Sequence, residues 1–594
     1  MPIPVATPWK GHALDKQRVL TATPGLADTR ERQGERLPTG VTDGDRAMTM
    51  SGAGAIPYRL RVGVIGHRRL PDDPLLVEQV DRALERVRQL VPSSPDTPIR
   101  LAVVSPLAEG ADRLVARMVL GDPETLLEVP LPLPLHDYQT DFTNEESKGE
   151  FQNLLARAVR VVELPACETR PEAYEQAGQY VVERCDVLIA LWDGQPSRGK
   201  GGTAEIVEWA RERRVPLFWI HTEPPFRIAE ELGDGVAMAS YRQLDEYNRA
   251  SVKPAEYERQ RAQQAAELAT QAERAGLERT YLQPFCAWAL PHYVRADMLA
   301  LRFQQRFFQF SDAIFLFAAF AVAVAGATAV AGSTPIVLST PLLPHVALLP
   351  LVELALMLLI LLILFAGRRQ GLHQRWIAYR FLAEQVRVAF FLALAGVPGS
   401  PKASAEHIKR KHPAEEWLQR ALDEVWSQRP APSPVPSCAS LKRFLGVAWI
   451  QDQLTYQYNK SHRHERRHRL LTGATVAIFV ITLVVTGLNA FGVVGHASSG
   501  SLLRNNGVAY LSIALPALAG ALRGIGAQRE HLRNVRRSGQ MARHLAMIKK
   551  RTDGASNLTS VHTIARQAEE VMLEENSDWL LTMEGHDFEL HDAV

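Results

Sequence analysis

The sequence predicts an α/β domain with a parallel sheet, followed by an α-helical membrane domain with four transmembrane helices. Between residues 58 and 222, short apolar runs alternate with segments of helical periodicity. Beyond residue 300, four apolar segments approach the roughly 20 residues that cross a bilayer. Because a helix satisfies its own backbone hydrogen bonds, such segments are stable in hydrocarbon, and we expect a membrane protein.

The composition of the 594-residue chain averages over two unlike halves. Hydrophobic residues make up 46% and charged residues 22%, and the formal charge is +2. This near-balance gives no general attraction to nucleic acid, so we expect no nucleic-acid partner. Four cysteines at 167, 185, 286 and 438 share no ligand spacing. We therefore expect no zinc site, no disulfide framework, no cofactor and a reducing compartment.

Residues 1–57 are rich in Gly, Pro, Thr, Asp and Arg and show no periodicity, which predicts a disordered leader. This stretch lacks the basic start and the following apolar run of a signal peptide. We therefore expect the N-terminal half to stay in the cytosol.

Residues 58–222 alternate strand and helix patterns. Between the first two predicted strands, Leu76, Val80, Ala83, Val87 and Leu90 repeat at helical spacing. Strands that are apolar on both faces and separated by amphipathic helices predict a parallel sheet covered on both sides. This Rossmann-like arrangement binds ligands at the carboxyl ends of its strands. The predicted strands are residues 59–65, 99–105, 126–132, 159–164, 186–192 and 215–221.

Three of the predicted strand ends carry residues suited to a phosphorylated ligand. A glycine, an imidazole and two guanidinium groups follow the first strand, and the start of a helix, which favours anions, follows the second. An aspartate follows the fifth strand, and then two glycines and a threonine begin a helix, where backbone can approach phosphate. The candidate ligand-binding residues are Gly66, His67, Arg68, Arg69, Ser105, Glu109, Gly110, Asp112, Arg113, Asp193, Gly201, Gly202, Thr203 and Glu205.

Each of these features also has a structural interpretation. Gly66 can be the turn after a strand, and Arg113 can pair with a helix neighbour. Thr203, Glu205 and Glu208 can be ordinary residues of a helix start. The joint occurrence at three strand ends favours a binding site more than any single feature does.

The segments VGVIGHRRL, SPLAEGADRLVA and CDVLIALWDG…GGTAEIVEWA resemble the SLOG superfamily, a group of Rossmannoid domains related to the cytokinin-activating phosphoribohydrolases. The resemblance covers about residues 59–221 and implies nucleotide binding. Those enzymes carry a PGGxGTxxE signature, from which GKGGTAE departs, so we expect binding rather than catalysis. Nucleoside deoxyribosyltransferases have a similar Gly-Thr-Ala-x-x-Glu arrangement, which leaves Glu205 or Glu208 as a nucleophile of an alternative enzyme.

The remaining chain divides around two apolar hairpins. Residues 223–300 are polar and predict a helical connector, and residues 397–440 read as a linker around one short amphipathic helix. The first hairpin and a helix that prolongs its second span into the cytosol occupy residues 301–396. The second hairpin and C-terminal cytosolic helices occupy residues 441–594. The predicted spans are residues 311–332, 346–366, 470–494 and 508–522.

Charge predicts the orientation of the hairpins. Arginines flank both hairpins on one side. The two opposite loops, residues 332–344 and 495–507, contain a single basic residue, Arg504. By the positive-inside rule, both termini are cytoplasmic. Glu353 stands near the middle of a span, where an ionisable side chain is costly, so it is a candidate pore-lining residue or a neutral acid between packed helices.

The two hairpins also look duplicated. Asp297 before the first matches Asp452 before the second, and Arg368 after the first matches Arg523 after the second at the same offset. Two-span units of this kind behind a SLOG domain resemble SLATT domains, the predicted pore-forming effectors of bacterial conflict systems. The resemblance covers about residues 295–579 and implies a multi-pass protein of the bacterial inner membrane that forms homo-oligomers.

The leading hypothesis is a nucleotide-sensing membrane effector of bacterial defence. His67, Arg68 and Arg69 would hold phosphate, and the 201–203 segment would add backbone and hydroxyl contacts. Three carboxylates would read ribose or base, namely Glu109, Asp112 and Asp193. The ligand would gate or assemble the membrane helices. The alternative is a membrane-anchored enzyme that cleaves an N-glycosidic bond of a nucleotide or nucleoside.

Overall fold

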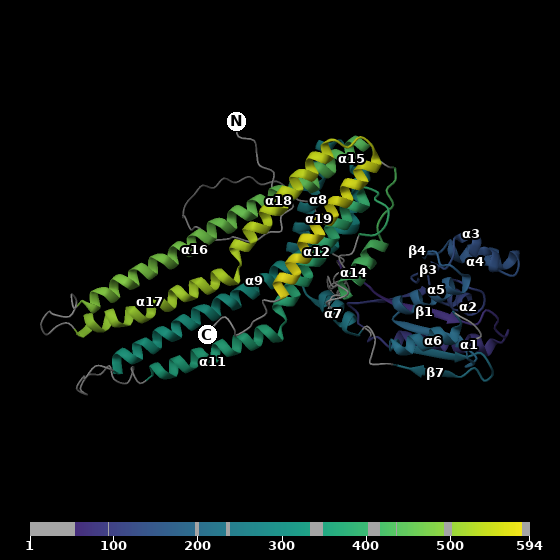
Figure 1. Ribbon diagram of the computed structural model, residues 1–594, viewed down its shortest axis with the longest axis horizontal. Coiled ribbons are helices and arrows are strands. Elements are labelled where there is room, and N and C mark those ends of the chain that lie inside the picture. The colour runs from purple at the N-terminus through teal and green to yellow at the C-terminus, as the bar shows by residue number, and fades with distance from the viewer. Residues whose placement is uncertain are drawn as a thin grey trace, which may run out of the picture. The chain divides into compact units, whose positions relative to one another are not determined.

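The computed structural model describes residues 54–92, 94–196, 201–232, 238–332, 348–401, 416–434, 436–491 and 502–584 (Figure 1). The predicted leader therefore lies outside the described residues, apart from residues 54–57. The described residues form two compact units. The α/β unit lies within Arg46–Ser251 and Ala405–Arg429, and the helical unit lies within Val252–Ser404 and Pro430–Val594.

A seven-stranded, mostly parallel sheet forms the centre of the α/β unit. Its order is β4-β3-β2-β1-β5-β6-β7, and only β6 and β7 are antiparallel. The six predicted strands are confirmed, and β7 is an addition from the segment expected to be a helical connector. The strands are β1 (Tyr58–Gly66), β2 (Ile99–Val104), β3 (Leu126–Leu131), β4 (Arg160–Glu163), β5 (Val187–Trp192), β6 (Leu217–His221) and β7 (Ile228–Glu231).

The central strands β1 and β5 are buried on both faces, which explains the uninterrupted apolar run of β5. Every residue of β5 and all but the last residue of β1 are buried. On α1, the predicted positions Leu76, Val80, Ala83 and Val87 are buried. The helices of this unit are α1 (Pro74–Gln89), α2 (Ala111–Val119), α3 (Leu135–Tyr138), α4 (Glu145–Leu155), α5 (Arg170–Arg184), α6 (Thr203–Glu212), α7 (Met238–Arg249) and α14 (Glu416–Ser427).

The order in which the chain adds strands to the sheet reverses at β1. The chain adds β2, β3 and β4 on one side of this strand and β5, β6 and β7 on the other. Gly66, the last residue of β1, pairs with Leu191 near the end of β5. The carboxyl ends of β1 and β5 are therefore neighbours, and the loops that follow them diverge from one point.

The helix α14 comes from the segment that the sequence analysis assigns to a linker. It belongs to the α/β unit, where it contacts β1 and α7. Residues 402–415, which precede it, lie outside the described residues.

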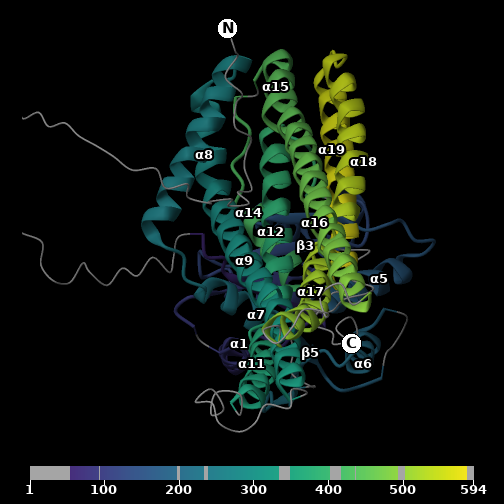
Figure 2. The ribbon, with the colours of Figure 1, turned by 90° about the vertical axis from the view of Figure 1, so that its left-hand side faces the viewer.

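The helical unit contains two hairpins of similar construction. In the first, α9 contacts the returning helix α11 and the following helix α12; in the second, α16 contacts α17 and α18 in the same way. The polar parts of α12, α16, α18 and α19 run side by side (Figure 2). The elements are α8 (Pro254–Ala275), α9 (Arg279–Gly332), α11 (Leu349–Arg369), α12 (Leu372–Leu394), α15 (Cys438–Phe444), π-helix η4 (Leu445–Gln451), α16 (Asp452–Ala490), α17 (Leu502–Gln528), α18 (His531–Asp553) and α19 (Leu558–Glu584).

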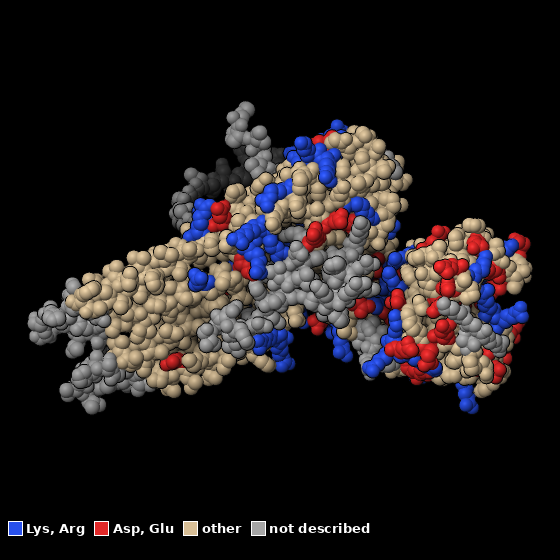
Figure 3. Space-filling view, in the orientation of Figure 1, with Lys and Arg blue, Asp and Glu red and all other residues tan. Residues whose placement is uncertain are grey.

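Among the described residues of this unit, four helical stretches are long and apolar enough to cross a membrane, namely Arg279–Val330, Leu349–Leu394, Cys438–Leu488 and Gly507–Asp553. Each of the four predicted spans overlaps one of them for most of its length, and residues 346–347 and 492–494 of the prediction lie outside the described residues. The apolar helices contact one another in the order α11, α9, α17, α16 (Figure 1). Few charged side chains are visible on this apolar part, whereas many lie on the polar part of the unit (Figure 3).

The second span of each hairpin ends at a sharp break instead of continuing as one helix. Gly371 lies between α11 and α12 with φ +55°, and Glu530 lies between α17 and α18 with φ +44°. The sequence analysis treats α12 as a prolongation of the span, which misses the break that the left-handed glycine creates. The apolar run at the end of α12 is buried, and α12 contacts α9 and α19.

Candidate functional site

His67 and Asp193 meet where the order of strands reverses. The backbone N–H of His67 donates to the carbonyl of Leu191 at 3.0 Å, which fixes the residue at the end of β1. The Nε2 atom of His67 lies 3.4 Å from Oδ1 of Asp193, which follows β5. Both side chains keep some exposure to solvent, 30% and 16% respectively. The structure thus brings these two predicted residues together at an accessible edge.

Glycines allow the chain to pack closely around this edge. A Cβ atom on Gly66 would lie 2.6 Å from the carbonyl oxygen of Leu191 on β5. Gly110 has φ +82°, and a Cβ there would lie 2.6 Å from the backbone of Arg68. The N–H of Ala111, the first residue of α2, donates to the carbonyl of His67 at 3.1 Å. The start of α2 therefore supports the loop after β1.

Ser105 and Asp112 form an internal contact of the loop between β2 and α2. The Ser105 hydroxyl donates to Asp112 Oδ2 at 2.9 Å, and the N–H of Ala108 donates to the same oxygen at 3.2 Å. Both side chains are buried. Burial raises the pKa of Asp112 to about 7, against the opposing hydrogen bonds. These two predicted ligand residues therefore shape the loop.

We expect Asp112 to make the stability of the α/β unit fall as pH rises. Its pKa is raised above the unfolded value of 3.8, so its contribution is present below about pH 4 and is lost as pH approaches 7. Asp112→Asn removes this titration. The melting temperature of D112N relative to wild type should therefore increase between pH 4 and pH 7.5, measured by thermal unfolding of the purified chain. A constant difference across this range would contradict the prediction.

Glu109 and Arg113 bind the loop before α4 and the first residues of that helix. Glu109 accepts hydrogen bonds from the N–H and hydroxyl of Thr143 at 3.0 and 2.9 Å, and from the hydroxyl of Ser147. Although burial opposes it, these hydrogen bonds lower the pKa of Glu109. The buried Arg113 donates to Leu107 and Ser147 and pairs with Glu150 at 3.1 Å. Both residues therefore join the loop between β2 and α2 to the start of α4.

Arg68 and Arg69 are exposed at the same edge. The guanidinium of Arg68 lies 5.2 Å from the ring centroid of Tyr174 on α5. The hydroxyl of Tyr174 donates to Asp141, which also pairs with Arg170 at 2.7 Å. Tyr174 is not among the predicted site residues, because a single tyrosine inside a helix pattern carries no signal that it faces another loop.

The helix α6 begins at the predicted glycines and threonine. Gly202 is the residue before the helix and Thr203 is its first residue, so Thr203 does not cap the helix. The N–H of Gly201 donates to Glu205 Oε2 at 2.8 Å. Glu208 is largely exposed and pairs with Arg211 at 3.3 Å. Glu205 therefore has the local role of a helix-start residue. Residues 197–200 lie outside the described residues.

Glu353 lies on the side of α11 that faces α9. It shares a helical face with Leu349 and Leu356, which contact α9 in an apolar cluster. Its side chain is half-buried. In this arrangement Glu353 lies at the contact between two helices of one hairpin.

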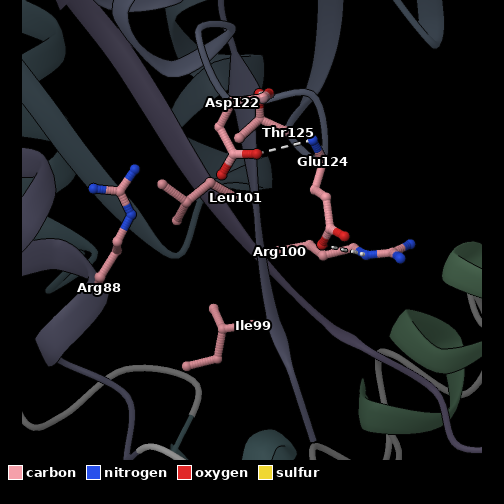
Figure 4. A pocket seen from close by; sticks show the side chains of 7 residues that line it. All are labelled: Arg88, Ile99, Arg100, Leu101, Asp122, Glu124 and Thr125. Atoms are coloured by element: carbon pink, nitrogen blue, oxygen red, sulfur yellow. Dashed lines mark hydrogen bonds and ion pairs between the residues drawn. The ribbon is translucent and has the colours of Figure 1, made fainter.

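A separate small cavity lies at the opposite end of the sheet. Its volume is about 120 Å³, below the roughly 300 Å³ at which ligand pockets begin. Figure 4 shows Arg100 and Glu124 paired across one side of it, 3.7 Å apart. The lining residues are Arg88, Ile99, Arg100, Leu101, Asp122, Glu124 and Thr125, none of them predicted for the site.

Among the described residues, no group of three or more His, Cys, Asp or Glu side chains is placed to hold a metal ion. Comparison of the chain with protein-family models and with curated proteins finds no match.

Proposed function

We propose that the chain is a nucleotide-sensing membrane effector, in which a ligand bound to the α/β unit gates or assembles the apolar helices. The observation that supports this most is the reversal of strand order between β1 and β5, with His67, Arg68 and Asp193 at its carboxyl edge. Open α/β sheets bind ligands at such points. The same chain carries four helices that are long and apolar enough to cross a membrane.

The proposed ligand is derived from a nucleotide. Arg68 and Arg69 offer exposed guanidinium groups to phosphate, and the first N–H groups of α6 offer a second anion contact. Asp193 and His67 offer an acceptor and a donor to ribose hydroxyls. Glu109 and Asp112, which the sequence analysis assigns to ribose or base, support the loops around this site instead. The Rossmann-like and SLOG resemblances agree with such a ligand.

The membrane part of the proposal rests on two similarly built hairpins with arginines at their polar ends. It places the protein in a bacterial inner membrane, with both termini in the cytoplasm, as the resemblance to SLATT effectors of defence systems implies. Glu353 lies between α9 and α11, so lining a pore requires these helices to separate or several copies to assemble. A ligand achieves this only by binding one arrangement more tightly than the other.

Equilibrium dialysis of the detergent-purified chain against ATP, NAD⁺ and ADP-ribose tests the ligand class. We expect at least one to bind, and Arg68→Ala to weaken it about 10- to 100-fold, since a charged hydrogen bond contributes about 1.5–3 kcal/mol. Arg82→Ala is the matched control, because Arg82 is exposed on α1 and pairs with Glu78. Absence of binding by all three, or equal losses in both variants, would contradict the proposed site.

Ion flux from liposomes that contain the purified protein tests the effector function. The bound nucleotide should change the flux of wild type, and R68A should need a correspondingly higher concentration. Liposomes that respond identically with and without the nucleotide would remove the gating part of the proposal, even where binding is observed.

A further inference from the structure

Two arginines lie within the buried strand β1. Arg59 and Arg61 are only 6% and 7% exposed, and their spacing of two places them on the same face of the strand. Buried arginines are rare unless they are paired, because desolvation of an unpaired charge is very costly. Glu128 of β3 is one partner, at 3.2 Å from Arg59 and 3.5 Å from Arg61. Both arginines lower the pKa of this carboxyl, although its burial opposes them.

The other partners come from α14. Glu424 lies 2.6 Å from Arg59 of β1 and 3.3 Å from Arg100 of β2. Asp423 lies 3.2 Å from Arg61. The side chain of Glu424 is 1% exposed. One helix from the middle of the chain therefore neutralises a buried cluster on two neighbouring strands.

Arg420 extends these contacts to the start of β5. It donates to Asp186 Oδ2 at 2.8 Å, and the same oxygen accepts the N–H of Arg61 at 2.8 Å. Around the charges, α14 buries Trp417, Leu418, Ala421, Leu422, Val425 and Trp426. Charged and apolar contacts together fix α14 against the strands at which the sheet reverses.

The path of the chain gives this contact a consequence for the hairpins. The chain passes from the α/β unit to the helical unit after Ser251, just before α8 and α9, and again after Arg429, just before α15 and α16. Each long helix that begins a hairpin is therefore joined through its N-terminal side to the α/β unit. Without α14, only the first hairpin would be joined to the α/β unit through its N-terminal side.

The second connection is short and rich in proline. Residues 430–436 read PAPSPVP, with proline at every second position. Proline fixes φ, and proline-rich segments act as semi-rigid spacers, whereas Gly/Ser segments behave as flexible chains. A semi-rigid spacer of this kind would pass a displacement of α14 on to α15.

We propose that α14 is a coupling helix, which transmits movement of the α/β unit to the second hairpin while residues around 252 transmit it to the first. Both hairpins then respond to one change in the sheet. This inference does not depend on which ligand the α/β unit binds.

Cutting the chain on either side of α14 tests the coupling and leaves α14 itself intact. One variant carries a protease site within residues 430–436, after α14, and the matched control carries it within residues 402–415, before α14. Fluorophores on bioorthogonal amino acids replace Glu163 of β4 and Tyr458 of α16, which are both exposed. Energy transfer then reports the distribution of distances between the units in the detergent-purified full chain.

Cutting after α14 should broaden the distance distribution, because it severs the second connection. The C-terminal fragment should stay associated with the rest of the helical unit, whose helices it contacts. Cutting before α14 also severs one connection between the units, from α12 to α14, but it should leave the distribution as in the uncut protein, since α14 remains joined to α15. Equal broadening by both cuts, or no broadening by either, would overturn the proposal. Both results are read without nucleotide, so they are distinguishable from a failure of the proposed function.

Discussion

Replacing Glu424 by alanine should destabilise the α/β unit by about 3–5 kcal/mol, the usual cost of removing one partner from a buried ion pair. The substitution leaves Arg100 without its contact to α14 and leaves Arg59 with Glu128 and Ser427 as its remaining contacts. Because both arginines belong to central strands, the loss applies to the core of the unit. Hydrogen exchange of β1 and β5 amides in the full-length protein measures it as a fall in the free energy of opening.

Asp423→Ala is the matched control for this prediction. The side chain of Asp423 is 26% exposed, and its partner Arg61 keeps Glu128. We expect a loss of about 1 kcal/mol or less, as for partly solvated pairs. If E424A proves no more destabilising than D423A, the buried cluster does not hold α14 in the way that we describe.

Replacing Gly524 by leucine should force α9 and α17 apart. A Cβ atom at this position would lie 2.6 Å from Cδ1 of Phe315, and the leucine adds three more carbon atoms. Small residues let apolar helices approach closely in membranes, and overpacking costs about 1–3 kcal/mol. Since α9 and α17 join the two hairpins, the melting temperature of the detergent-purified protein should fall.

Gly520→Leu provides the comparison for G524L. Gly520 lies one turn earlier on α17, and a Cβ atom there meets no neighbour within 4 Å. The same change of volume and helix propensity should therefore leave the melting temperature close to that of wild type. Equal falls in both variants would show that loss of glycine, rather than contact with Phe315, is responsible.

The sequence predicts those elements of the α/β unit whose apolar pattern is visible within one short segment of the chain. Most of the six predicted strands are largely buried runs, although β4 is partly exposed, and the spacing of apolar residues on α1 identifies its buried face. The strand β7 reads IAEE and carries two glutamates in four residues, so its pattern gives no strand signal. The strand β7 forms because its backbone pairs with that of β6.

The sequence could not separate ligand-facing residues from loop-supporting ones. His67 and Asp112 both follow a strand and both suit a polar ligand, yet Asp112 is buried against Ser105 whereas His67 remains partly exposed. Such differences depend on contacts between distant segments. The same reason hides α14, because its amphipathic pattern is visible but Arg59 and Glu424 are 365 residues apart.

The position of α14 in the chain also sets an order of biosynthesis. Residues 54–251 emerge from the ribosome well before α14, with the whole first hairpin made in between. At about 5 to 20 residues per second, this delay amounts to roughly ten seconds or more. During that time Arg59 and Arg100 have no access to Glu424. The charges of Arg59 and Arg100 therefore stay incompletely neutralised until the first hairpin has been synthesised.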